Sequence, residues 1–127
     1  MKIDTHVLLR SEESGGHVSM VENVVPPRTQ GPFLHAHDFD EAFYILDGEL
    51  VFQVGDELVT ARAGELAFAP RNVPHTFTNR GEAEARYLLV ITPAGFERYF
   101  GRMTDDPPEW ALQPIPDVQR VGEQIPL

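Results

Sequence analysis

The sequence contains no cysteine among its 127 residues. This absence excludes disulfide scaffolds, thiolate zinc sites, iron–sulfur clusters and cysteine nucleophiles. Basic residues are also scarce, because 10 Lys and Arg stand against 20 Asp and Glu, which gives a net charge of -10. A surface this acidic repels the phosphate backbone of nucleic acids and the anionic surface of membranes. We therefore expect neither nucleic acid nor a membrane as a partner.

Long apolar runs are missing as well. No stretch approaches the roughly 18–20 apolar residues of a transmembrane helix, and the first six residues lack the apolar core of a secretory signal. We therefore expect a cytoplasmic protein. The hydrophobic content of 42% is typical of a folded globular chain, and the length fits one domain, since domains of about 100–150 residues are the commonest.

Turn-forming residues, by contrast, are frequent, with 10 Gly and 11 Pro. They separate short apolar segments, one pair of which is joined by Asp47-Gly48, a favoured hairpin turn. Strands are predicted at residues 3–9, 17–25, 33–37, 41–46, 50–54, 57–61, 66–69, 75–78 and 85–92. Many short strands without an intervening helix predict an all-β domain, either an antiparallel sandwich or a closed barrel.

A helical pattern appears only late in the sequence. Phe96, Tyr99 and Phe100 are spaced i, i+3 and i+4, so they would form one apolar stripe. We expect a short helix over about residues 96–102. A helix this short is stable only when it packs its stripe on the barrel, so the three aromatic residues are interpreted as core and not as a substrate site.

Two segments are expected to be irregular. Residues 11–16 are rich in Ser, Glu and Gly and are interpreted as a turn or loop. Residues 105–127 contain five prolines and are interpreted as an extended tail with Trp110 as its anchor. Residues 1–104 are therefore predicted to form the single domain.

Three polar residues interrupt an apolar face. In extended chain, His35, His37 and Glu41 share one parity with Phe43 and Ile45, so all five point to the same side. Because the rest of that face is apolar, it is expected to point into the core. Two imidazoles and a carboxylate are unfavourable there unless something pairs with them. A divalent metal ion is a common solution.

His75 is the natural fourth ligand. It begins a strand after the rigid turn at residues 70–74, and its same-face neighbour Phe77 is apolar. Three imidazoles and one carboxylate suit one divalent transition ion, namely Fe, Mn, Ni, Co or Zn, and do not suit Ca or Mg. Any one of these histidines, taken alone, is more often a hydrogen-bonded core or rim residue than a ligand.

A substrate pocket is expected beside these ligands. Its predicted lining consists of four residues: Phe33, Phe43, Gln53 and Phe77. For Gln53, exposure to solvent is an equally good interpretation. Asp38 and Asp40 flank the ligands, but their parity favours the solvent side over the metal.

The spacing of the first three ligands forms a recognisable motif. It reads His35, one residue, His37, three residues, Glu41, six residues and Gly48. The segment of about residues 31–48 resembles the first motif of the cupin superfamily, which is H-x-H, three or four residues, E, six residues, G.

A second motif follows at residues 64–79. It reads Gly64, five residues, Pro70, one residue, Asn72, two residues, His75, three residues and Asn79. This segment resembles the second cupin motif, G, five residues, P-x-G-x-x-H, three residues, N. The family glycine is replaced by Asn72. The turn is expected to survive, because Asn tolerates the left-handed conformation better than most residues.

The resemblance implies a small single-domain cupin, that is, a double-stranded β-helix or jelly-roll barrel with the four ligands around one metal ion. The segments at residues 41–49 and 92–97 are similar to those of small bacterial cupins grouped with quercetin dioxygenases. In some cupin oxygenases the residue equivalent to Glu41 is thought to accept a proton, which makes Glu41 the candidate catalytic residue. Cupins commonly dimerise, and the outward-facing Tyr44 adds to the expectation of a homodimer.

Three functions follow as hypotheses. The first is a metal-dependent dioxygenase, or other oxidoreductase, acting on a small enolisable or phenolic compound. The second is a non-redox cupin, such as an isomerase, a lyase or a polyketide-cyclase-like enzyme. The third is a non-enzymatic module that binds a small molecule.

Overall fold

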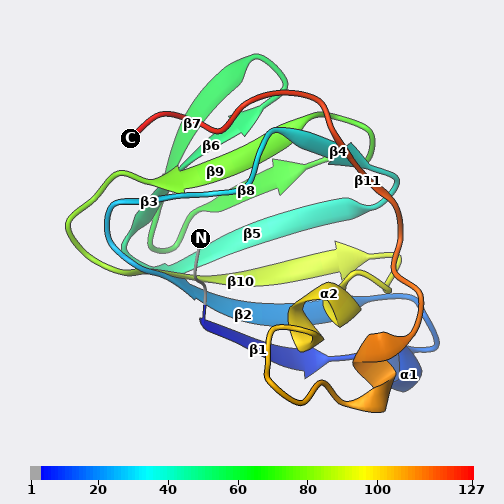
Figure 1. Cartoon of the computed structure of the whole chain (residues 1–127). Coiled ribbons are helices and arrows are strands. Elements are labelled where there is room, and N and C mark those ends of the chain that lie inside the picture. The colour runs from blue at the N-terminus through cyan, green and yellow to red at the C-terminus, as the bar shows by residue number, and fades with distance from the viewer. Residues whose placement is uncertain (1–3) are drawn as a thin grey trace.

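A computed structural model describes residues 4–127 of the chain as two antiparallel sheets that lie against each other (Figure 1). One sheet has five strands, in the order β1 (Asp4–Leu9), β2 (Ser19–Val25), β10 (Ala85–Thr92), β5 (Asp40–Asp47) and β8 (Leu66–Ala69). The other has the order β11 (Val118–Arg120), β4 (His35–His37), β9 (His75–Asn79), β6 (Glu49–Val54) and β7 (Glu57–Arg62), with β3 (Thr29–Gln30) paired to β9.

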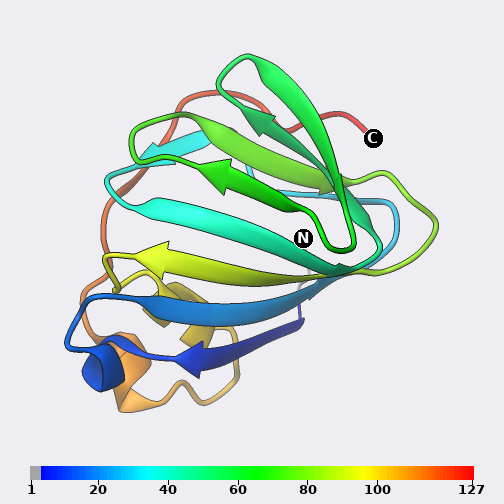
Figure 2. The ribbon, with the colours of Figure 1, turned by 180° about the vertical axis from the view of Figure 1, so that it is seen from behind.

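This arrangement confirms the predicted all-β jelly roll. Of the two forms that the sequence left open, the sandwich is the one observed, because the strand pairing within residues 4–127 leaves the two sheets separate. The view from behind shows the same two layers (Figure 2). Of the first expected strand, residue 3 lies outside the described residues, and the rest is β1.

The core lies between the two sheets and is built by strand alternation. On β5, Glu41, Phe43 and Ile45 are buried, whereas Tyr44 and Leu46 are exposed. Since successive side chains point to opposite faces of a strand, β5 presents Glu41 to the core together with two apolar side chains. The local pattern thus places a carboxylate inside the sandwich.

Two short helices lie at one end of the five-stranded sheet (Figure 1). The helix α2 (Glu97–Gly101) was predicted, but α1 (Ser11–Ser14) replaces the loop expected at residues 11–16. Two acceptors explain the first turn of α1: Glu13 accepts a hydrogen bond from the backbone N–H of Arg10, and the fully buried carboxylate of Glu97 accepts two from Ser11. That carboxylate therefore ties α1 to α2.

The tail is more ordered than its prolines suggested. It forms a 3-10 helix, η1 (Glu109–Leu112), and then runs along the molecule to β11, which pairs with β4 (Figure 1). Trp110 lies in η1 and packs on Gly101 at the end of α2. Because β11 adds to the free edge of β4, the tail becomes part of the sheet that carries His35, His37 and His75. No helix in residues 4–127 is long and apolar enough to cross a membrane.

Candidate metal centre

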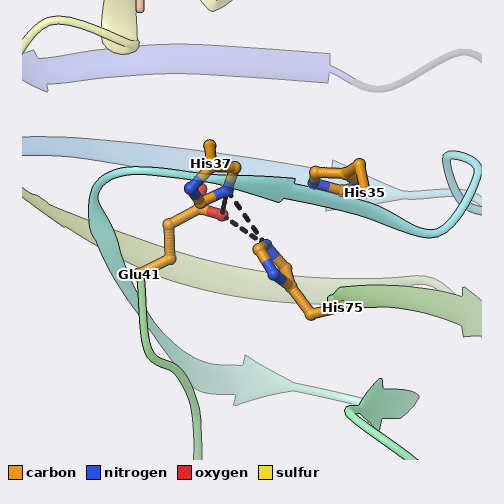
Figure 3. Close-up of side chains that lie close together, drawn as sticks. All are labelled: His35, His37, Glu41 and His75. Atoms are coloured by element: carbon orange, nitrogen blue, oxygen red, sulfur yellow. Dashed lines mark hydrogen bonds and ion pairs between the residues drawn. The ribbon is translucent and has the colours of Figure 1, made fainter. Parts of the chain in front are cut away.

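The four predicted ligands lie together inside the sandwich. His35 and His37 come from β4, Glu41 from the start of β5 and His75 from the start of β9, and their ligand atoms all lie within 4.8 Å of one another (Figure 3). The register places the Cα of His35 opposite that of His75. Strand pairing therefore joins residues that are far apart in sequence.

The tightest part of the group consists of three buried side chains. Glu41 Oε1 lies 2.9 Å from His37 Nε2 and 2.9 Å from His75 Nε2, and the two Nε2 atoms are 3.1 Å apart (Figure 3). His35 lies to one side of this triad, with its ring centre 4.5 Å from that of His75. His35 is half-buried, so it forms the more open side of the group.

A backbone carbonyl contacts the Nδ1 atom of each histidine. The partners are Phe33 for His35 at 2.8 Å, Phe39 for His37 at 3.0 Å and Val73 for His75 at 3.0 Å. In a neutral imidazole only one ring nitrogen bears hydrogen. Donation from Nδ1 to these carbonyls thus leaves a lone pair on every Nε2.

This donor set fits a metal ion. With neutral imidazoles, the Nε2 atoms of His37 and His75 and the carboxylate of Glu41 face one another with lone pairs and no hydrogen between them. Such an arrangement is unfavourable unless a cation lies among the donors, and a hydrogen bond from the other ring nitrogen is what usually orients a histidine ligand. His35, His37, Glu41 and His75 are therefore suited to a divalent transition ion.

The charge states of the group agree with this interpretation. Burial by itself would raise the pKa of Glu41, but hydrogen bonds from the Nε2–H groups of His37 and His75 outweigh burial and lower the pKa to about 2. An ion among the donors would take the place of these hydrogens. Burial also lowers the pKa of His35 below its ordinary value. Both effects favour the metal-binding forms at neutral pH, namely a carboxylate and a neutral imidazole.

The loop before His75 is fastened to the strand of the other histidines. Asn72, at the position of the family glycine, has φ of 64°, so the turn does require the left-handed conformation. Its backbone N–H donates to the carbonyl of His37 at 2.7 Å. Arg71 pairs with Asp40 at 3.0 Å, and Asp38 is exposed. The two aspartates therefore do not belong to the ligand group.

A cavity of about 480 Å³ opens beside the ligands. His35, Glu41 and His75 line it, whereas His37 lies behind them with its ring stacked on Phe39 at 3.6 Å. The rest of the wall is mainly apolar and comes from both sheets, α2 and the tail: Pro32, Phe33, Phe43, Phe77, Tyr87, Leu89, Phe96, Tyr99, Phe100, Met103, Ile115, Pro116, Asp117, Val118 and Arg120.

Of the residues predicted to line a pocket, Phe33, Phe43 and Phe77 do line this cavity. Gln53 does not line it, which agrees with the alternative interpretation that this side chain points away from the pocket. On β6 the buried positions are Leu50 and Phe52, so Gln53 points the other way, and its amide donates to the carbonyl of Gly55. The alternating faces of one strand account for the difference.

The sequence interpretation missed two parts of the wall. The stripe of Phe96, Tyr99 and Phe100 was assigned to the core. Phe100 does belong to the core and Phe96 packs against it, but all three side chains also line the cavity. The helical spacing indicates that these residues lie on one side of the helix, but it does not indicate which part of the protein that side contacts. The tail contributes Val118 and Arg120, for which strand pairing with β4 is the only signal.

Comparison with known proteins agrees with the fold and the ligand group. Residues 21–107 match the model of the Cupin domain family. One relative, the tetracenomycin polyketide synthase protein TcmJ of Streptomyces glaucescens, is 32% identical over 74 residues, which are 58% of this chain and 50% of the relative. The oxalate-binding protein of Thermotoga maritima is 36% identical over 59 residues, which are 46% of this chain and 49% of the relative.

A solved structure is similar over a larger share of the chain. The crystal structure of a predicted oxalate decarboxylase from Thermotoga maritima aligns with a TM-score of 0.67 and 28% identity, and covers 72% of this chain and 80% of that protein. By contrast, the chain spans about half the length of the curated relatives it matches.

Proposed function

This chain belongs to the cupin family, and from that premise we propose that it is a metal-dependent enzyme that acts on a small enolisable or phenolic compound. One observation carries the proposal. The lone pairs of the ligand group converge at the wall of an aromatic-lined cavity, so a bound ion and an aromatic molecule would meet there.

His35, His37, Glu41 and His75 would hold one Fe, Mn, Ni, Co or Zn ion. Such an ion would supply Lewis acidity, which lowers the pKa of a bound enol or phenol, and a redox-active ion would also supply chemistry with O₂. The protein itself orients the ligands through the carbonyls of Phe33, Phe39 and Val73.

The aromatic walls would hold the body of the substrate and exclude water from its reacting end. Phe43, Phe77 and Phe96 are the side chains to which we assign this task. We assign Glu41 first the role of a ligand, because its carboxylate faces the Nε2 atoms of His37 and His75. It would accept a proton from substrate only after one of those contacts is broken.

The proposed reaction is dioxygenation, and a non-redox reaction is the second candidate. The second candidate is favoured by the name of a relative, because TcmJ is described as a polyketide synthase protein. A polyketide is itself enolisable, so both candidates would use the Lewis acidity of an ion held by the four ligands, and they differ in whether O₂ is consumed. The oxalate-binding relative supports the third candidate, a module that binds without turnover.

Oxygen uptake separates these candidates. The metal content of purified protein is first determined by elemental analysis, and the protein is then loaded separately with Fe, Mn, Ni, Co or Zn and given a panel of flavonols and other phenols. Dioxygenation predicts O₂ consumption that depends on the metal and is lost in His75→Ala but kept in His17→Ala, which changes an exposed histidine remote from the group. Conversion of substrate without O₂ uptake would replace the first candidate by the second. If none of these ions binds, the metal-dependent proposal is overturned.

A further inference from the structure

One positively charged side chain lies at the cavity. Among the residues of 4–127 that line it, Arg120 alone is a lysine or arginine. Arg120 belongs to β11, and its Cα pairs with that of His35 on β4. Directly opposed residues of an antiparallel pair project to the same face, so Arg120 is on the cavity side, one strand away from a metal ligand.

The side chain of Arg120 is held at the mouth of the cavity. Its guanidinium carbon lies 3.5 Å from the ring centre of Phe33, in the geometry of a cation–π contact. Phe33 is 40% exposed and the Arg120 side chain is 57% exposed, although both line the cavity. Stacking fixes the plane of the guanidinium and leaves its edge N–H groups as donors.

Other charges do not neutralise this guanidinium. Its ion pair with Glu123, at 3.5 Å, joins two exposed side chains, and such pairs contribute little to stability. Asp117 also lines the cavity, but no ion pair joins it to Arg120 in the described residues. In a protein with a net charge of -10, a guanidinium that is held only by an exposed ion pair beside an apolar cavity is the local feature that attracts an anion.

We propose that Arg120 recognises the carboxylate of a planar aromatic substrate whose ring lies in the cavity and whose other end points to the ligand group. A guanidinium fork matches a carboxylate in a bidentate manner. A single arginine balances one negative charge, which favours a carboxylate over a phosphate dianion. The inference deepens the proposed function, since it names the substrate class for the same cavity.

Binding of two matched probes tests the proposal. 2-Naphthoate and its neutral amide, 2-naphthamide, share the same ring system and differ in charge. Their affinities are measured by calorimetry for chelator-treated and for metal-loaded protein. Wild type is expected to prefer the carboxylate. Arg120→Gln should weaken binding of 2-naphthoate about tenfold or more, as expected for loss of a charge-assisted hydrogen bond, and should leave 2-naphthamide unchanged.

Two further variants sharpen the test. Arg120→Lys should recover part of the affinity, because lysine keeps the charge but not the planar fork. Arg62→Gln removes an exposed arginine that does not line the cavity and should bind both probes as wild type does. The proposal is overturned if wild type shows no preference for 2-naphthoate, or if Arg120→Gln weakens both probes equally. Because binding is also measured on protein without metal, a failure of the Arg120 proposal can be distinguished from a failure of the protein to bind metal.

Discussion

Glu41 Oε1 lies 2.9 Å from Nε2 of His75, although 34 positions separate the two residues in the sequence. This contact joins β5 of one sheet to β9 of the other across the core. Both side chains are at least 95% buried, so the pair needs a cation in a place where solvent cannot provide compensation. Packing of the two sheets thus brings two of the proposed metal ligands into contact.

The first prediction concerns metal content. His75→Ala removes a ligand from the buried triad, and we expect its metal affinity to fall by more than the roughly 10–100-fold that loss of an outer hydrogen-bond partner costs. Asp38→Asn is the matched control, because Asp38 is exposed and next to His37 yet outside the ligand group. Elemental analysis after identical purification, with competition against a chelator, gives the comparison. Equal metal in His75→Ala and wild type would show that the assignment is wrong.

The second prediction concerns stability with bound metal. An ion that binds only the folded chain should stabilise it by about 2.7 kcal/mol at a free concentration of 100 times its Kd. Thermal unfolding should therefore shift to higher temperature with Zn or Mn and return with chelator. Ca and Mg, which prefer oxygen ligands, should have little effect. His37→Ala should abolish the shift, and a shift that persists in this variant would place the ion elsewhere.

The third prediction concerns Glu97, which is fully buried and accepts bonds from Ser11 and from the N–H of Gly95. Burial alone would raise its pKa, but these hydrogen bonds outweigh burial and lower the pKa. A lowered carboxyl pKa stabilises the fold above the unfolded value of about 4.5 and loses that contribution as pH falls below it. Glu97→Gln should destabilise the fold at pH 7 by about 2–3 kcal/mol.

Urea unfolding between pH 7 and pH 3 checks the sign. The stability gap between wild type and Glu97→Gln should narrow as the pH falls, since wild type loses its carboxylate there. Glu57→Gln, an exposed change on β7, is the control and should follow wild type at every pH. If the difference in unfolding free energy between wild type and Glu97→Gln stays constant with pH, the charge of Glu97 contributes nothing to stability.

The fourth prediction concerns self-association. The outer face of the five-stranded sheet is apolar near its β8 edge, where Leu66 lies opposite Tyr44 and Phe68 opposite Ala42. Phe68 is 50% exposed, and a second copy of the chain could bury this face against its own. Phe68→Glu should then shift the sedimenting species from dimer to monomer. Leu58→Glu, on the other sheet, should leave it a dimer. A wild type that is monomeric at micromolar concentration would contradict the expectation.

Several features of the site could be predicted because they depend on local geometry. The period of two along a strand puts His35 with His37 and Glu41 with Phe43 on one face, and the apolar partners identify that face as the interior. The motif spacing adds His75 and the left-handed turn that Asn72 adopts. The short helix is also local, because Phe96, Tyr99 and Phe100 alone define its apolar stripe.

The tertiary structure decided what these faces meet. Strand pairing sets the 3.1 Å between the Nε2 atoms of His37 and His75, and chain geometry supplies the carbonyl that orients each ring. Pairing of β11 with β4 turned a proline-rich tail into a wall and brought Arg120 opposite His35. The spacing of apolar residues indicates only which side chains of one segment share a face. Contacts between distant segments depend on which strand edges and faces remain free when the whole chain packs. The sequence thus determined the ligands and their common face, and only the packed chain decided the cavity and the cation at its mouth.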